Sequence, residues 1–132
     1  MNSVFASASE TRALLLLSKP YMRARLQAAD MVTVKGACGL AGLTAHAIRQ
    51  RVANGQILGL KGAGLGLRLP KWQFSEPLRS AVPKVISGLG TPEPWLVLTF
   101  LESPHAALDG RNPRAAIEQG DLARVMAMAM SE

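Results

Sequence analysis

Residues 44–52 carry side chains of the types that read base edges in the major groove of DNA. An arginine can bond guanine through two hydrogen bonds, a glutamine can bond adenine in the same way, and an alanine can meet a thymine methyl group. The predicted DNA-contacting set in this segment is Thr44, Ala45, His46, Arg49, Gln50 and Arg51, with Arg49 and Gln50 as the specificity residues. Lys35, Lys61 and Arg68, together with Arg51, are predicted to contact phosphates or the minor groove.

A helix-turn-helix is the element that would present these side chains, and the flanking residues predict one. Thr33 can cap a first helix, Gly42 breaks it, and Leu43 is predicted to be buried in the turn. Thr44 can cap the second helix, which an Asn54-Gly55 pair ends with residues that tolerate positive φ. The inward side chains are predicted to be Val34, Ala37, Cys38, Leu40 and Ala41 in the first helix and Ala47, Ile48 and Val52 in the second.

Two short apolar runs after the helix pair predict a β-hairpin wing. They are residues 57–60 and 67–69, and the three glycines in residues 61–66 between them suit a flexible hairpin tip. Trp72 and Phe74 follow and are expected to fold back on the helices. Before the helix pair, residues 1–30 are predicted to form an N-terminal arm with helices over residues 9–17 and from 21 to about 29.

A stretch rich in Gly and Pro, residues 87–94, is the predicted linker between two units. It separates a winged helix-turn-helix domain at residues 31–86 from a small helical domain at residues 95–132. The predicted fold class is therefore mainly α, a helix-turn-helix with a short β-hairpin wing followed by a small helical domain.

Local signals mark three helices in the predicted helical domain. Trp95 opens an apolar helix, and Asn112 can cap a second helix that has Pro113 in its first position and ends at Gly120. Asp121 can cap the last helix. The inner face of that last helix is predicted to hold Leu122, Val125, Met126 and Ala129.

The two parts of the chain carry net charges of opposite sign. Residues 1–84 hold twelve Lys or Arg and three acids, which gives 12 − 3 = +9, whereas residues 85–132 hold three Arg and six acids, which gives 3 − 6 = −3. A polyanion would be attracted to the first part and repelled by the second. The distribution favours a nucleic-acid-facing half and a half that faces another partner; the alternative is a basic surface that is only solvated.

The sequence disfavours several other function classes. Cys38 is the single cysteine and is expected in the core, so no intrachain disulfide forms, and no ligand cluster has metal spacing. His46 and His105 have no nucleophile arrangement near them, and residues 62–66 lack the Lys-Ser/Thr of a phosphate loop. We expect no enzyme activity, metal or cofactor. The apolar run at 13–17 is too short for a bilayer, which favours a cytoplasmic protein outside the membrane.

Residues 31–60 resemble the winged helix-turn-helix of MerR and excisionase proteins. Those proteins commonly read apolar-Thr-apolar-x-Glu-Ala-Ala, then Leu-Gly-Leu-Ser, then a recognition helix with Arg and a Gly-containing stop. The corresponding residues here are Val32-Thr-Val-Lys-Gly-Ala-Cys38, then Leu40-Ala-Gly-Leu-Thr44, then Arg49 and Gly55. Gly36 stands where the Glu is usual, so no reciprocal capping box is expected. The resemblance implies binding to double-stranded DNA.

The second half resembles the C-terminal toxin-binding domain of Xre/MbcA/ParS antitoxins. The residues that carry it are Pro94-Trp95, Phe100-Leu101, Leu108-Asp-Gly-Arg-Asn-Pro113, Ile117-Glu-Gln-Gly-Asp121 and Val125. It implies a DNA-binding antitoxin and autorepressor that neutralises a cognate toxin of the NAD-attacking RES class. The implied partner contacts are Trp95, Asp109, Gly110, Arg111, Asn112 and Pro113.

Other interpretations of the same features stay open. A stand-alone phage or plasmid regulator, or an excisionase-like protein without a toxin, would use the same helix pair. A two-helix turn with a hairpin also occurs in domains that bind peptides. Because operators are usually read as two half-sites, a homodimer is expected for either DNA-binding function.

Overall fold

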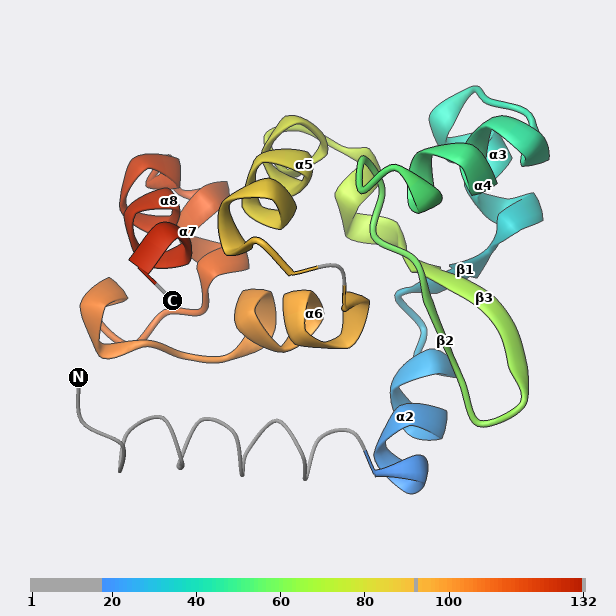
Figure 1. Cartoon of the computed structure of the whole chain (residues 1–132), viewed down its shortest axis with the longest axis horizontal. Coiled ribbons are helices and arrows are strands. Elements are labelled where there is room, and N and C mark those ends of the chain that lie inside the picture. The colour runs from blue at the N-terminus through green and yellow to red at the C-terminus, as the bar shows by residue number, and fades with distance from the viewer. Residues whose placement is uncertain (1–17, 92, 132) are drawn as a thin grey trace.

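The computed structural model describes residues 18–91 and 93–131, and the chain in these residues is mainly helical. Figure 1 shows α3, α4 and the sheet at one end of the molecule and α7 and α8 at the other. The predicted fold class is confirmed, while the helix expected over residues 9–17 lies outside the described residues. The α-helices are α2 (Lys19–Leu26), α3 (Val34–Ala41), α4 (Ala45–Ala53), α5 (Leu78–Leu89), α6 (Pro94–Glu102), α7 (Pro113–Glu118) and α8 (Leu122–Ser131).

Hydroxyl caps begin both helices of the helix-turn-helix. The Thr33 hydroxyl accepts a hydrogen bond from the backbone N–H of Gly36 at 3.2 Å, and the Thr44 hydroxyl accepts one from Ala47 at 3.1 Å. Each bond satisfies one of the N–H groups that a helix leaves unpaired in its first turn. Gly42 ends α3 at a φ of 68°, in the left-handed region that a residue without Cβ adopts at little cost.

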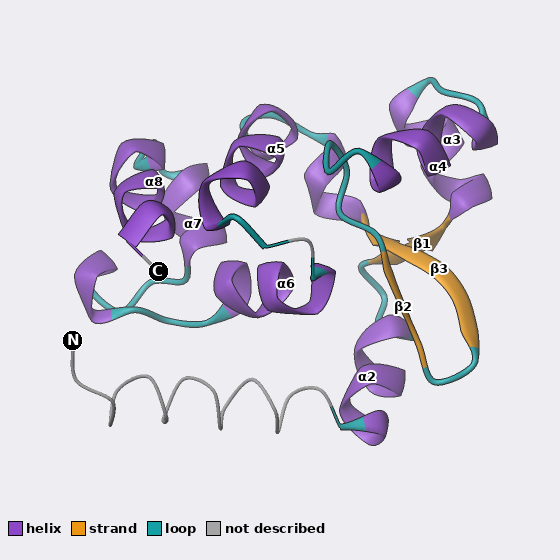
Figure 2. Cartoon of the chain, in the orientation of Figure 1, coloured by secondary structure: helices purple, strands orange, loops and turns teal. Residues whose placement is uncertain are grey.

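A three-stranded antiparallel sheet connects the helix pair to the rest of the chain (Figure 2). Its strands are β1 (Met31–Thr33), β2 (Leu60–Gly62) and β3 (Leu65–Pro70), in the order β1-β3-β2. The expected hairpin is present, with β2 and β3 joined through Ala63 and Gly64. The sequence did not predict β1, because its partner residues lie more than 30 positions later, with Met31 opposite Pro70 and Thr33 opposite Arg68.

Apolar side chains on the two faces of the sheet enter two different clusters. Val32, Leu67 and Leu69 pack with the inward residues of α3 and α4, centred on Ile48, which is fully buried. The expected inward stripe of α4 is therefore confirmed for Ile48 and Val52, whereas Ala47 is only half-buried and lies outside the cluster. In α3 the expectation is wrong for Leu40, whose side chain is 48% exposed, because the apolar face of this short helix is covered only along Val34, Ala37, Cys38 and Ala41.

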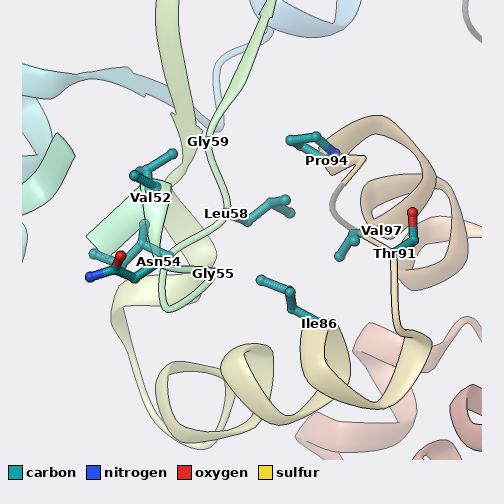
Figure 3. A pocket seen from close by; sticks show the side chains of 11 residues that line it. Val52, Asn54, Gly55, Leu58, Gly59, Ile86, Thr91, Pro94 and Val97 are labelled. Atoms are coloured by element: carbon teal, nitrogen blue, oxygen red, sulfur yellow. The ribbon is translucent and has the colours of Figure 1, made fainter. Parts of the chain in front are cut away.

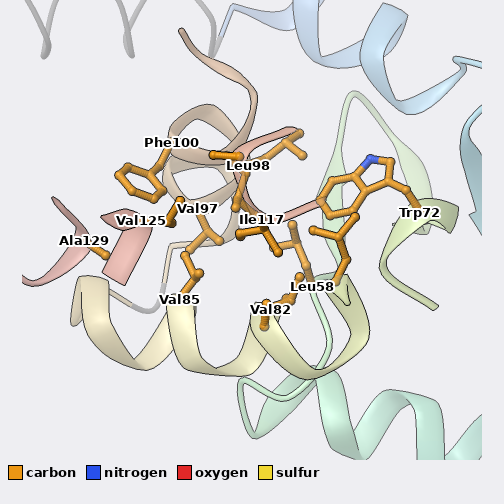
Figure 4. Packing of buried hydrophobic residues seen from close by; sticks show 14 of the residues in the cluster. Leu58, Trp72, Val82, Val85, Val97, Leu98, Phe100, Ile117, Val125 and Ala129 are labelled. Carbon is orange, nitrogen blue, oxygen red and sulfur yellow. The ribbon is translucent and has the colours of Figure 1, made fainter. Parts of the chain in front are cut away.

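The larger cluster extends across the position where a linker was expected. Leu58 and Leu60 pack in the same cluster as Val82 and Val85 of α5 and as buried residues of α6, α7 and α8 (Figure 4). Helix α5 continues to Leu89, so the first part of the expected linker at 87–94 is helical. The described chain therefore has one main core shared by the wing strands and the C-terminal helices, and no separate core begins at residue 95.

The signals at the start and end of α7 give the expected structures, whereas the Asp121 carboxylate before α8 pairs with Arg111. Asn112 caps α7 by accepting a hydrogen bond from Ala115 N–H at 2.7 Å, and Pro113 occupies its first turn. Gly120 follows with a φ of 93°, and Val125 and Ala129 of α8 are buried as expected. Within the described residues, none of the helices has the length and apolar character needed to cross a bilayer.

Candidate nucleic-acid interface

The outward face of α4 carries the side chains expected to read bases. His46, Arg49 and Gln50 are exposed; Arg49 and Gln50 follow His46 by three and four residues, and all three point away from the buried Ile48. The Thr44 cap holds the first turn, so the positions of these side chains are fixed by a regular helix. An exposed helix of this kind fits the major groove of B-DNA, where the N-terminal residues of a recognition helix contact base edges.

Residues 31–75, which form the helix pair, the sheet and the short 3₁₀-helix η1 (Lys71–Phe74), contain cations and no carboxylate. All but Arg68 are exposed, and Arg68 is half-buried. Among the described residues, none of these cations forms an ion pair. The cations of this basic segment are Lys35, Arg49, Arg51, Lys61, Arg68 and Lys71.

The carboxylates of the described chain all lie outside the basic segment, and each is engaged locally. Five of them pair with arginines on α2, α7, α8 or the loop before α7: Asp30, Glu102, Asp109, Glu118 and Asp121. Glu76 pairs with Arg79, and Glu93 caps α6 by accepting a hydrogen bond from Trp95 N–H. The surplus positive charge of the molecule is therefore concentrated on the helix pair and the wing.

The predicted cations outside the base-reading positions lie on four elements. Lys35 lies in the first turn of α3, Arg51 in the last turn of α4, and Lys61 and Arg68 on the two wing strands. A cation at a helix N-terminus opposes the helix dipole, so the position of Lys35 has no stabilising explanation within the helix. The Arg68 guanidinium donates a hydrogen bond to the carbonyl of its neighbour Leu67, which holds it along the wing.

Gln73 positions the segment that follows α4, and sequence reasoning did not identify this residue. Its side chain is 3% exposed and forms a bridge to the segment that leaves α4. The Leu58 N–H donates to Gln73 Oε1 at 2.8 Å, and Gln73 Nε2 donates to the carbonyls of Leu58 at 2.7 Å and Pro70 at 3.1 Å. The carboxamide thus replaces a backbone pairing partner and fixes the start of the wing beside α4.

A cavity of about 260 Å³ lies behind the C-terminal end of α4 (Figure 3). Val52 and Asn54 line it from the side of α4, and Ile86 and Val97 line it from α5 and α6. No titratable side chain is among its lining residues, so it offers no acid, base or thiol. Across the ranges that the structure covers, no group of three or more His, Cys, Asp or Glu side chains is placed to hold a metal ion.

The interpretation of Trp95 as a partner contact is not supported by its position. Its side chain is 5% exposed, its indole Nε1 donates to the carbonyl of Lys61 at 2.9 Å, and its ring packs edge-on against Tyr21. An indole is large and has one polar edge, so burial with that edge hydrogen-bonded is its favoured environment. Trp95 therefore fastens α6 to the wing strand β2.

The other predicted partner residues lie in the turn before α7 and in its first positions. Arg111 donates to the Leu108 carbonyl, to Gln119 and to Asp121, with distances of 2.7 to 2.9 Å. Asn112 is used as the cap of α7, and Pro113 is buried. Asp109 and Gly110 remain exposed at the turn, with φ of 58° and 83°. Of the six residues, these two are the ones with open surface.

An ion network fixes the orientation of α2. The Arg25 guanidinium contacts Asp30 at 2.7 Å and Glu102 of α6 at 2.6 Å, and its side chain is 13% exposed. The hydrogen bonds from Arg25 hold the pKa of Asp30 below its usual value. Burial, together with the nearby Glu102, raises the pKa of Tyr21 on the same helix. The network ties α2 to α6 across the main core.

No family model, no curated protein and no solved structure matches this chain.

Proposed function

We propose that this chain binds double-stranded DNA through α4 and the β2–β3 wing, and reads sequence through Arg49 and Gln50. The observation that carries the proposal is the charge of the basic segment, residues 31–75, in which six cations stand with no carboxylate. Unpaired cations in one small unit repel one another, and a bound polyanion relieves that repulsion. DNA phosphates supply such an anion, and their neutralisation releases counterions and favours binding.

The types of the exposed side chains support DNA over an acidic peptide. Arg49 and Gln50 are the residue types that form paired hydrogen bonds with guanine and adenine, and both lie on the outward face of a capped helix. A domain that binds an amphipathic helical peptide would instead need an apolar groove for side-chain anchors. The outward face of α4 has no large apolar residue among its exposed positions, which are Ala45, His46, Arg49, Gln50, Arg51 and Ala53.

Selection of bound duplexes from a random pool tests this proposal. We expect a recurring sequence to be enriched, and the affinity for it to fall steeply as salt is raised. Arg49→Ala should reduce discrimination against a base change in the contacted position by 1 to 3 kcal/mol, or about 5- to 150-fold, while much of the nonspecific binding remains. Lys84→Ala is the matched control, since Lys84 is an exposed helical cation on α5, next to Met126 and Met130 of α8.

The absence of any enriched sequence, or equal discrimination by Arg49→Ala and Lys84→Ala, would refute the assignment of α4 as the reading helix. If the affinity for DNA does not fall as the salt concentration is raised, the proposed contacts between the cations and the DNA phosphates are refuted.

Neutralisation of a RES-type toxin, autorepression and homodimer formation stay predictions from the resemblance and from operator symmetry. Four of the six residues implied as toxin contacts are used inside the molecule, as described for Trp95, Arg111, Asn112 and Pro113. A direct test is co-purification with the product of the adjacent reading frame. A RES-like product that binds supports the antitoxin function, and an unrelated adjacent gene supports a stand-alone regulator.

A further inference from the structure

We propose that α2 and the wing tip form a second surface that holds the phosphate backbone of the same duplex that α4 reads. This α2–wing surface consists of Lys19 and Arg23 of α2 and Lys61 of β2, and all three side chains are exposed. The inference rests on the proposed function and extends it, because it adds a contact at the other end of the sheet from α3 and α4 (Figure 2).

The rotation of α2 about its axis is fixed, which determines where its cations point. Leu26 is 1% exposed in the main core, and Arg25 is held by Asp30 and Glu102. Lys19 and Arg23 are four residues apart, so they lie one above the other along the helix, and both side chains are exposed. Of the arginines on α2, Arg25 is thus committed to internal ion pairs, while Arg23 faces solvent.

Helix α2 is packed directly against the wing. A Cβ added to Gly62 would lie 2.5 Å from the Met22 Cε atom, so the end of the Met22 side chain fills the space beside this strand residue. The Arg23 guanidinium also donates to the Ala63 carbonyl at the hairpin tip, at 3.4 Å. Figure 2 shows α2 beside the hairpin, with α3 and α4 at the other end of the sheet. These two contacts hold α2 against the tip of the hairpin.

The charge of the α2–wing surface is not neutralised within the described chain. Lys19, Arg23 and Lys61 form no ion pair there, and the two carboxylates that contact α2, Asp30 and Glu102, are occupied by Arg25. The surface has the same sign as the helix pair and is connected to it by the sheet. A single polyanion that passes both surfaces would gain from each, and duplex DNA is long and stiff enough to do so.

Salt-dependent affinity on a duplex obtained by selection measures the number of phosphates that the chain neutralises. The logarithm of the binding constant falls with the logarithm of salt by about 0.9 for each phosphate contact. We expect Lys19→Gln and Arg23→Gln each to reduce this slope by about 0.9, and the double variant by about 2. Lys84→Gln removes the same charge from α5 and should leave the slope unchanged.

Hydroxyl-radical footprinting locates the contact. The Lys19→Gln/Arg23→Gln variant should lose protection at one edge of the footprint, while protection at the bases read through Arg49 persists. A thermal melt checks folding, and Lys19→Gln alone serves if Arg23→Gln disturbs the wing.

Two outcomes separate this inference from the proposed function. If the wild-type chain binds a selected sequence through Arg49, but Lys19→Gln and Arg23→Gln change the slope no more than Lys84→Gln does, the α2–wing surface does not hold DNA. If the wild-type chain binds no duplex, the proposed function itself fails. Loss of one flank of the footprint together with a lower slope supports the inference.

Discussion

Replacement of Gln73 by methionine tests whether a buried carboxamide holds the segment after α4 to the end of the wing strand β3. Methionine matches the length of glutamine but offers no donor, so the change removes the three hydrogen bonds to Leu58 N–H, Leu58 carbonyl and Pro70 carbonyl. Each such bond contributes about 1 kcal/mol net, and an unsatisfied buried group costs about 1 to 3 kcal/mol. With Gln73 3% exposed, water cannot easily replace the lost partners.

The expected loss is about 3 kcal/mol of unfolding free energy, which for a chain of this size lowers Tm by about 10 °C. Urea unfolding followed by circular dichroism measures it. Gln56→Met is the matched control, because Gln56 is exposed on the same segment and its change should stay within about 0.5 kcal/mol.

Amide hydrogen exchange of Leu58 gives an independent readout, since its N–H donates to Gln73 in the folded state. We expect its protection to fall selectively in Gln73→Met under conditions where α8 stays protected. If Gln73→Met is as stable as Gln56→Met, and Leu58 exchange is unchanged, the bridge does not have the role assigned to it.

Two further predictions concern the wing turn and the ion network. Ala63 has a φ of 53° and precedes Gly64 at 73°, as in a type I′ turn. Asparagine adopts positive φ more readily than alanine, so Ala63→Asn should stabilise the fold by about 0.5 to 1 kcal/mol. An unchanged or lower Tm would contradict that turn assignment. Because Arg25 lowers the folded-state pKa of Asp30, their pairing stabilises the fold above the unfolded-state pKa of about 3.9 and is lost as pH falls through the folded-state value. Asp30→Asn should therefore lower the free energy of unfolding at about pH 7 but differ little from wild type at about pH 2. Urea unfolding at a series of pH values measures this difference, and a difference between variant and wild type that does not change with pH would exclude the linkage.

The sequence predicted the parts of the fold that depend on neighbouring residues. Thr33, Thr44 and Asn112 each cap a helix by bonding an N–H three residues later, so residue type and spacing were enough to place them. The amphipathic pattern likewise placed Ile48 and Val52 on the inner face of α4. The outward face followed from these assignments, and with it the candidate base-reading residues.

The features that the sequence did not predict depend on contacts between distant segments. The pairing of β1 with β3 joins Met31 to Pro70, and the indole of Trp95 meets the carbonyl of Lys61. Gln73 looks like an ordinary polar residue until Leu58 is placed beside it. The supposed boundary at 87–94 failed as a division between cores because glycine and proline content reports local backbone freedom, whereas a core is defined by side chains that pack across it.

NMR titration of the isotope-labelled chain with a selected duplex tests the central claim most directly. We predict that the largest amide shifts fall on α4 and on the β2–β3 wing, with a second group on α2, while α8 shifts little. The two ends of the molecule in Figure 1 make these outcomes easy to distinguish. Shifts concentrated on α5 and α8, with α4 unaffected, would contradict the assignment of DNA binding to the helix-turn-helix.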